Sequence, residues 1–368
     1  MVKSIRTLLR RVKFNLNYLT SSQIEIPINT ETYRYRNPKY FDIVLDYLDQ
    51  ANIDKKNLEQ VHRQYIVFGQ EIEVNNYSKD IFSGYDFEST KKKFKPAYFN
   101  IADVKVPYEI GRLQGIQKNN LIAQEQAIFP EHKIDINKFP TIFWNSPMDV
   151  AIRNINLIFH RNFDCDIHQR IIANSQEEID AHISHHYLYI KNNLENVGNV
   201  VGNHYLVELA SLLLTIATFD FSSSKDDFLY LTNELNEQLD RQFNNDGTSF
   251  EGSSHYAAFV TEALLICKLA IEEVDEKSLI LKKIEGIIEA NRLLLKTLIV
   301  NEELSQIGDN DSGRLFYFEH NEYKPLNMNW LINLIDYVYP DMSTRATDLY
   351  FSSKKETENL VNLSGYKK

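Results

Sequence analysis

Apolar residues recur at intervals of three and four along most of the chain after about residue 37, which is the spacing of one face of an α-helix. The segments with this pattern are 40–48, 113–128, 150–159, 179–194, 204–217, 228–243, 256–271 and 279–298. Short stretches rich in Gly, Asn and Ser separate several of them, as expected for turns. Because short connections make neighbouring helices antiparallel, the pattern predicts an all-α fold built from helical hairpins.

Three regions depart from this pattern. Residues 65–100 mix short alternating apolar runs with glycines and aromatic residues, and we expect irregular structure there. Residues 339–368 lose the periodicity and are interpreted as a tail. Residues 1–36 carry scattered basic residues between apolar positions at helical spacing. This N-terminal segment is predicted to be a basic amphipathic helix that docks on the fold or, as an alternative, lies on an anionic membrane surface. The main domain then spans residues 37–338.

The composition and charge of the chain exclude some classes of function. The 368 residues include 40 Lys and Arg against 51 Asp and Glu, a formal net charge of −11. This balance argues against a nucleic-acid partner, whose binding needs a basic face. The basic residues near the start leave no signal-peptide stretch, and Cys165 and Cys267 form no CxxC pair. We therefore expect a cytoplasmic protein, with membrane association through the N-terminus as the alternative.

A first candidate site lies in residues 198–204, just before the most apolar helix. The pattern places Asn203 or a neighbour at the N-cap, where a short polar side chain bonds to free backbone amides. A helix N-terminus also attracts anions such as a carboxylate. Asn203 and His204 could bind one there. In the structural alternative, Asn203 only caps the helix and His204 packs in its first turn.

A second candidate lies in residues 245–256. Thr248 and Glu251 have the T-x-x-E spacing of a capping box, which would put Tyr256 about two turns into the next helix. A phenol can serve as a general acid or base when its surroundings tune it. Tyr256 is one of 21 tyrosines, however, so a structural role is the alternative.

Metal sites find weaker support. Residues 308–314 alternate oxygen-bearing side chains like half of a calcium loop, but no glutamate closes it, and a turn that directs Arg314 to a ligand is preferred. His182 and His186 have i, i+4 spacing without a third ligand, which is typical of a solvated helix face. The sequence therefore predicts no metal and no cofactor.

Five segments together resemble the heparinase II/III-type polysaccharide lyases. They are DVKVPYEIGRLQ (103–114), WNSPMDVAIRNINLI (144–158), GNHYLVEL (202–209), QFNNDGTSFEGSSHY (242–256) and GDNDSGRL (308–315). The resemblance covers roughly residues 67–315 and implies an incomplete (α/α) toroid of antiparallel helical hairpins whose central cleft binds acidic polysaccharide. In such lyases a β-sandwich domain follows the toroid.

The chemistry that this resemblance implies is β-elimination at a uronic acid. The C5 proton is removed after the sugar carboxylate is neutralised, and the glycosidic oxygen at C4 leaves. Asn203 and His204 match the pair that neutralises the carboxylate, and Tyr256 matches the tyrosine that exchanges protons. Plausible sugar contacts from the matched segments are Arg112, Trp144, Arg153, Glu251, His255 and Arg314.

Two departures from the family pattern matter. Ala257 stands where the family commonly has His after the tyrosine, with His255 on the other side. Only about fifty residues follow Arg314, too few for the sandwich, so we expect either a fragment of a longer lyase or a naturally short form, with a separate β-sandwich domain or subunit as a possible partner. The isolated chain should then turn over poorly. An acidic protein that binds a polyanion must also concentrate positive charge locally, which predicts a positive groove around Asn203.

Two other functions stay open. One is a toroid that binds acidic glycan or docks a partner without catalysis. The other is a glycoside hydrolase on the same kind of fold, which needs two carboxylates beside the scissile bond. The acidic residues available in the motifs are Asp246, Glu251, Asp309 and Asp311.

Overall fold

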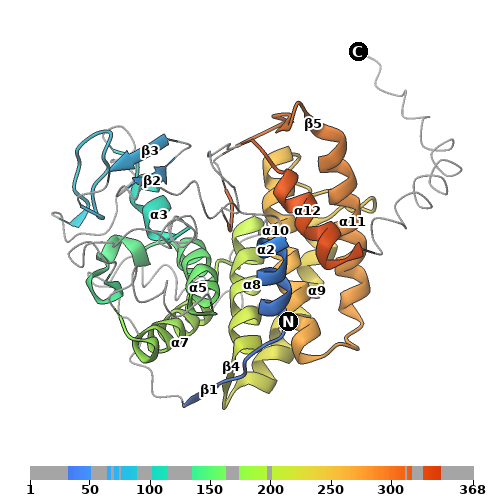
Figure 1. The fold of residues 1–368 in the computed structure, drawn as a ribbon, viewed down its shortest axis with the longest axis horizontal. Coiled ribbons are helices and arrows are strands. Elements are labelled where there is room, and N and C mark those ends of the chain that lie inside the picture. Colours follow the sequence, from blue (N-terminus) through green and yellow to red (C-terminus); the bar gives the residue numbers. More distant parts are fainter. Residues whose placement is uncertain are drawn as a thin grey trace, which may run out of the picture.

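The computed structural model describes residues 32–50, 64–67, 70–73, 76–88, 102–114, 135–162, 174–196, 201–310, 313–316 and 326–340. Helices dominate these residues and the strands among them are short (Figure 1). The predicted all-α character is thus confirmed for the described part of the chain. In that part, no helix is both long and apolar enough to cross a membrane.

Six long helices follow the predicted segments closely. They are α5 (Pro147–Asn162), α7 (Gln176–Asn192), α8 (Asn203–Thr218), α9 (Ser224–Gln242), α10 (Ser254–Val274) and α11 (Ile280–Leu298). Helix α2 (Tyr40–Gln50) also matches its prediction. The predicted helix at 113–128 is different, because residues 113 and 114 are not helical and the rest lies outside the described residues.

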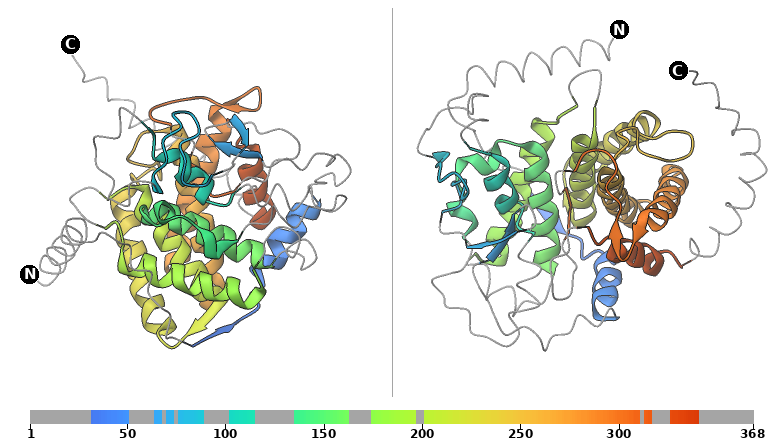
Figure 2. Two further views of the ribbon diagram at one scale, coloured as in Figure 1. Left: turned by 90° about the vertical axis from the view of Figure 1, so that its left-hand side faces the viewer. Right: turned by 90° about the horizontal axis from the view of Figure 1, so that it is seen from above.

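The long helices form two rows. Helix α8 packs between α5 and α10, while α7, α9 and α11 pack against α5, α8 and α10 respectively. The first row is buried along nearly its whole length, and the second buries one face only. This difference follows from sequence: α8 is apolar on almost every side, whereas α9 and α11 alternate apolar and charged stripes. The right-hand view in Figure 2 shows green α5 and α7 on one side and orange α11 on the other.

Residues from the predicted N-terminal segment join the helical body. Strand β1 (Tyr33–Tyr35) pairs antiparallel with β4 (Phe219–Phe221), which follows α8 directly. Tyr33 lies opposite Phe221 in this register, and Tyr40 donates or accepts a hydrogen bond with Thr218 at 2.7 Å. The proposed boundary at residue 36 therefore falls inside a packed unit. The basic amphipathic helix itself, like the tail after residue 340, lies outside the described residues.

Short elements complete the fold. In the region expected to be irregular, β2 (Gln64–Val67) and β3 (Gln70–Glu73) form an antiparallel hairpin, so that prediction was wrong for these residues. Helix α3 (Lys105–Gly111) and the 3-10 turns η4 (Ile136–Lys138) and η5 (Thr141–Trp144) precede α5. Strands β5 (Ile299–Val300) and β6 (Glu303–Leu304) follow α11. Helix α12 (Asn329–Val338), which periodicity missed, packs on α2, α10 and α11.

Candidate functional site

The N-terminal ends of α8 and α10 lie together and carry the predicted site residues. Gly202 is the N-cap of α8, and Asn203 is its first residue. The backbone N–H and Nδ2 of Asn203 donate to Glu251, which precedes α10, at 3.0 Å and 2.9 Å. A Cβ on Gly202 would lie 3.2 Å from Glu251 Oε1, so a glycine permits this close approach. The Asn203 side chain therefore joins two helix ends instead of capping its own.

His204 belongs to a chain of three ionisable groups. Its side chain is 51% exposed, and Nδ1 lies 2.5 Å from Oε2 of Glu195. The backbone N–H of Glu195 donates in turn to Oε2 of Glu208 at 2.8 Å. Burial raises the pKa of Glu208 well above its ordinary value, and the nearby Glu195 raises it further. The buried carboxyl group of Glu208, the carboxyl group of Glu195 and the surface imidazole of His204 thus lie one after another.

Tyr256 has a carboxylate partner as well. Its Oη donates to Oδ2 of Asp309 at 3.2 Å. Ser253 caps α10 by accepting the N–H of Tyr256 at 3.1 Å, so Tyr256 lies in the first helical turn. The predicted capping box was wrong, because Thr248 donates to Asp246 within its own turn and Glu251 accepts from α8.

Residues 305–310 cross the start of α10 and bring Asp309 to Tyr256. The N–H of Ser254 donates to the carbonyl of Ile307 at 2.9 Å, and Ser253 Oγ donates to the carbonyl of Asp309. Gly308 has φ 73°, and a Cβ there would lie 2.7 Å from the carbonyl of Gly252. Only glycine fits this crossing, because the added atom would meet fixed backbone.

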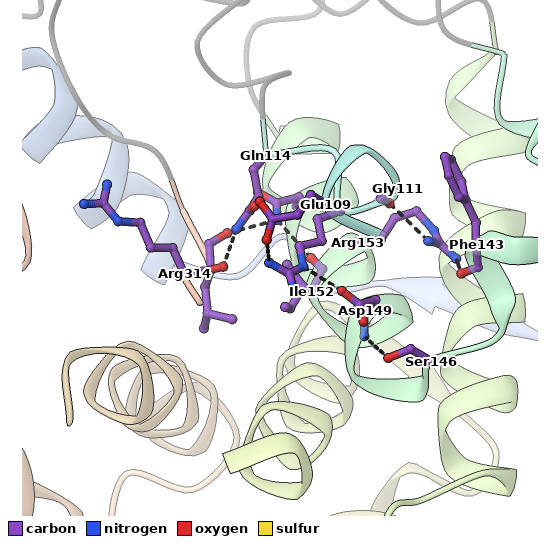
Figure 3. A network of polar contacts seen from close by, with 12 residues as sticks. Glu109, Gly111, Gln114, Phe143, Ser146, Asp149, Ile152, Arg153 and Arg314 are labelled. Atoms are coloured by element: carbon purple, nitrogen blue, oxygen red, sulfur yellow. Dashed lines mark hydrogen bonds and ion pairs between the residues drawn. The ribbon is translucent and has the colours of Figure 1, made fainter. Parts of the chain in front are cut away.

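The three arginines that were predicted to contact sugar are buried and bind protein groups. Figure 3 shows the network around Arg153, which donates to Gly111 and Phe143. Arg112 Nε donates to Asp149 at 2.6 Å. Arg153, fully buried, donates to Nε2 of His186 and to two backbone carbonyls at 2.8–3.1 Å. Arg314, also fully buried, donates to the carbonyl of residue 327 at 3.2 Å. The expectation that these side chains contact sugar does not fit their burial.

Trp144 and His255 are buried too. The Trp144 ring lies 4.6 Å from that of His186 and 5.3 Å from that of Tyr189, and only 4% of the residue is exposed. It packs in the core and offers no stacking platform at the surface. His255 is 1% exposed within α10. Tyr256, the next residue in α10, is the one that contacts residues 305–310, through Asp309.

Charge around the site differs from the expected positive groove. The described residues there contribute the carboxyl groups of Glu195, Glu208, Glu251 and Asp309, and one imidazole. Arg112, Arg153 and Arg314, which were expected to offset this negative charge, are buried and bind other protein groups. Among the described residues, no group of three or more His, Cys, Asp or Glu side chains is arranged to hold a metal ion.

Sequence reasoning missed three of these groups. Glu208 had a detectable signal, since it is a charged residue inside an otherwise apolar helical run. Asp309 was noted only as a turn residue or possible acid. Glu195 follows α7 in a loop, and nothing in its local sequence marks it.

Comparisons with known proteins found no relative from which a function could be inferred. No protein-family profile, curated protein or solved structure matches the chain. What the arrangement offers is an imidazole and a phenol, each hydrogen-bonded to a carboxyl group, at the starts of adjacent helices. Such pairs can donate and accept protons when their geometry meets a substrate.

Proposed function

We propose that this chain is the helical domain of a polysaccharide lyase that binds a uronic-acid-containing polysaccharide and cleaves it by β-elimination. The two rows of helices support an incomplete (α/α) toroid, with α5, α8 and α10 as its inner helices. The resemblance to heparinase II/III-type lyases provides the substrate class. A β-sandwich domain or subunit would complete the site.

One observation carries the proposal: Asn203 and His204 begin α8, Tyr256 begins the adjacent α10, and Glu251 connects the two ends. A second observation supports it. The segments that carry the resemblance make direct contacts, since Gln114 donates to the carbonyl of Arg314 and Asn156 donates to that of Leu315 at 3.0 Å. Segments selected in the sequence alone therefore meet in space.

In the proposed reaction, Asn203 and His204 hydrogen-bond to the sugar carboxylate and reduce its negative charge. The C5–H bond then breaks and its electron pair forms the C4=C5 double bond, while Oη of Tyr256 takes up that proton and gives its own to O4 as the C4–O4 bond breaks. Tyr256 exchanges these protons, and Asp309 orients its hydroxyl. Because Nδ2 of Asn203 donates to Glu251 in this structure, a sugar acid must share or displace that contact.

Product chemistry tests the proposal. The purified chain is incubated with alginate, heparin, hyaluronan or chondroitin, and the C4=C5 double bond of the product is followed by its ultraviolet absorbance. Tyr256→Phe should lower the rate by roughly 100-fold or more, as expected for loss of general acid–base catalysis. Tyr230→Phe on α9 is the matched control and should keep the rate. Binding of a polysaccharide without product would indicate a glycan-binding domain.

The acidic residues at the site favour one other activity. Glu195, Glu208, Glu251 and Asp309 would suit a glycoside hydrolase, which uses one carboxyl group as acid and another as base or nucleophile. A hydrolase gives a saturated product that carries an oxygen atom from water. Mass spectrometry of products formed in ¹⁸O-labelled water separates this activity from β-elimination.

A further inference from the structure

The two ring nitrogens of His204 have different surroundings. Nδ1 lies 2.5 Å from Oε2 of Glu195, a distance at which the carboxylate accepts a hydrogen bond from Nδ1–H. The His204 side chain is half exposed and that of Glu195 is 25% exposed. The imidazole is therefore turned with Nδ1 toward the protein loop after α7. Nε2, on the other side of the ring, points away from Glu195.

Glu195 is itself held from behind. Its backbone N–H donates to Glu208, which is fully buried in the second turn of α8. Burial raises the pKa of Glu208 well above its ordinary value, and the charge of the neighbouring Glu195 raises it further. Two tyrosines also face the pair, Tyr108 from α3 and Tyr189 from α7. Burial, and then the neighbouring acids among smaller causes, raise the pKa of both phenols.

The groups around Glu195 indicate that it accepts a hydrogen bond from the His204 ring. Burial keeps the phenols of Tyr108 and Tyr189 protonated at pH 7, and within the described part of the chain the basic side chain that contacts Glu195 is the His204 ring. Hydrogen bonding to a carboxylate fixes which nitrogen of an imidazole carries the proton, and it orients the ring.

We propose that Glu195 is a positioning residue that keeps a proton on Nδ1 of His204 and so turns Nε2 toward the bound sugar acid, where Nε2 takes up a proton from solvent and the imidazolium donates it in a hydrogen bond to the sugar carboxylate. This inference rests on the proposed function for the identity of the ligand, but the tautomer can be measured without it. Glu208 supports the arrangement by accepting the backbone N–H of Glu195 at 2.8 Å.

Nitrogen-15 NMR of the imidazole tests the proposal on the free protein near pH 8, with His204→Gln used to assign the signal. Wild type should show the Nδ1–H form, whereas imidazole in water favours Nε2–H. Glu195→Ala should shift His204 to mainly Nε2–H. Glu195→Gln keeps an acceptor oxygen and should retain Nδ1–H, while Glu237→Gln, on α9, matches the change of charge and should have no effect. A wild-type Nε2–H form, or no change in Glu195→Ala, overturns the proposal.

Kinetics separate this proposal from the lyase proposal. If the chain cleaves a polysaccharide, Glu195→Ala should lower kcat about 10-fold or more with a smaller change in KM, and Glu195→Gln should recover part of the loss. Circular dichroism checks that both variants are folded. An Nδ1–H tautomer in a chain that forms no unsaturated product refutes the lyase and leaves the positioning role in place. Unsaturated product from a chain whose His204 is in the Nε2–H form supports the lyase and refutes the positioning role of Glu195.

Discussion

Asn203 shows how a residue expected to bind a ligand can already be bound within the protein. Its backbone and side-chain N–H groups donate to one carboxylate, that of Glu251, at 2.9–3.1 Å. Hydrogen bonds to a charged acceptor are stronger than those to a neutral one. Glu251 therefore competes with any ligand carboxylate for the same donors. Binding of a sugar acid at Asn203 requires that acid to share or displace the contact with Glu251.

This competition predicts a pH-dependent effect of Asn203→Asp. The substitution replaces a donor with a second carboxylate facing Glu251, and at pH 7 it should lower the free energy of unfolding by about 2–3 kcal/mol. The loss should shrink toward pH 4, where one of the two acids takes up a proton. Urea denaturation at both pH values measures it.

Asn203→Ala is the control, because it removes the same side-chain hydrogen bonds without adding charge. It should cost about 1 kcal/mol at both pH values. Equal stability of Asn203→Asp and Asn203→Ala at pH 7 would show that residue 203 does not face Glu251 closely.

At the level of elements, local pattern was sufficient for the long helices and insufficient for contacts between distant segments. Helices α8 and α10 lie in segments whose apolar residues recur at helical spacing, and both are buried along nearly their whole length. Strand β1 has only three residues, and its partner β4 lies more than 180 positions later, so no local signal could pair them. The same limit applies to Glu195 and Glu251, whose partners are set by how helix ends meet.

Arg153 shows this limit most clearly. Its position within a matched segment favoured a sugar contact, yet it connects three elements to α5 through Gly111 of α3, Phe143 of η5 and His186 of α7. A guanidinium can bond three acceptors in fixed directions, whereas an ammonium is a point charge. Arg153→Lys should therefore lower the free energy of unfolding by roughly 2–4 kcal/mol, because buried acceptors lose their donors.

Chemical denaturation measures this loss, with Arg241→Lys as the matched control. Arg241 pairs with Glu237 on the exposed side of α9 at 2.7 Å, so this change should alter stability by less than about 0.5 kcal/mol. Wild-type stability of Arg153→Lys would mean that the carbonyls of Gly111 and Phe143 do not depend on this side chain.

Across the whole molecule, buried acids should make stability depend on pH. Glu262 on α10 accepts a hydrogen bond from the N–H of Leu315 at 2.6 Å, which holds residues 313–316 against α10. Burial raises the pKa of Glu262 from 4.5 to about 8, although Leu315 and Arg314 lower it in part. The folded state then holds a proton that the unfolded chain releases. Stability is therefore greatest below about pH 4.5 as far as this group is concerned, and its contribution falls as pH rises to about 8.

Glu262→Gln keeps an acceptor for Leu315 and removes the titration, so it should flatten the decline between pH 4.5 and 8. The gain at pH 8 should be on the order of a few kcal/mol relative to wild type. Part of the decline should persist, because burial raises the pKa of Glu208 in the same direction. Urea denaturation across this pH range, with the exposed Glu276→Gln as the charge-matched control, measures the effect. Parallel pH profiles for wild type and Glu262→Gln would mean that Glu262 is ionised in the folded protein, held so by Arg314 and the backbone amide that it accepts.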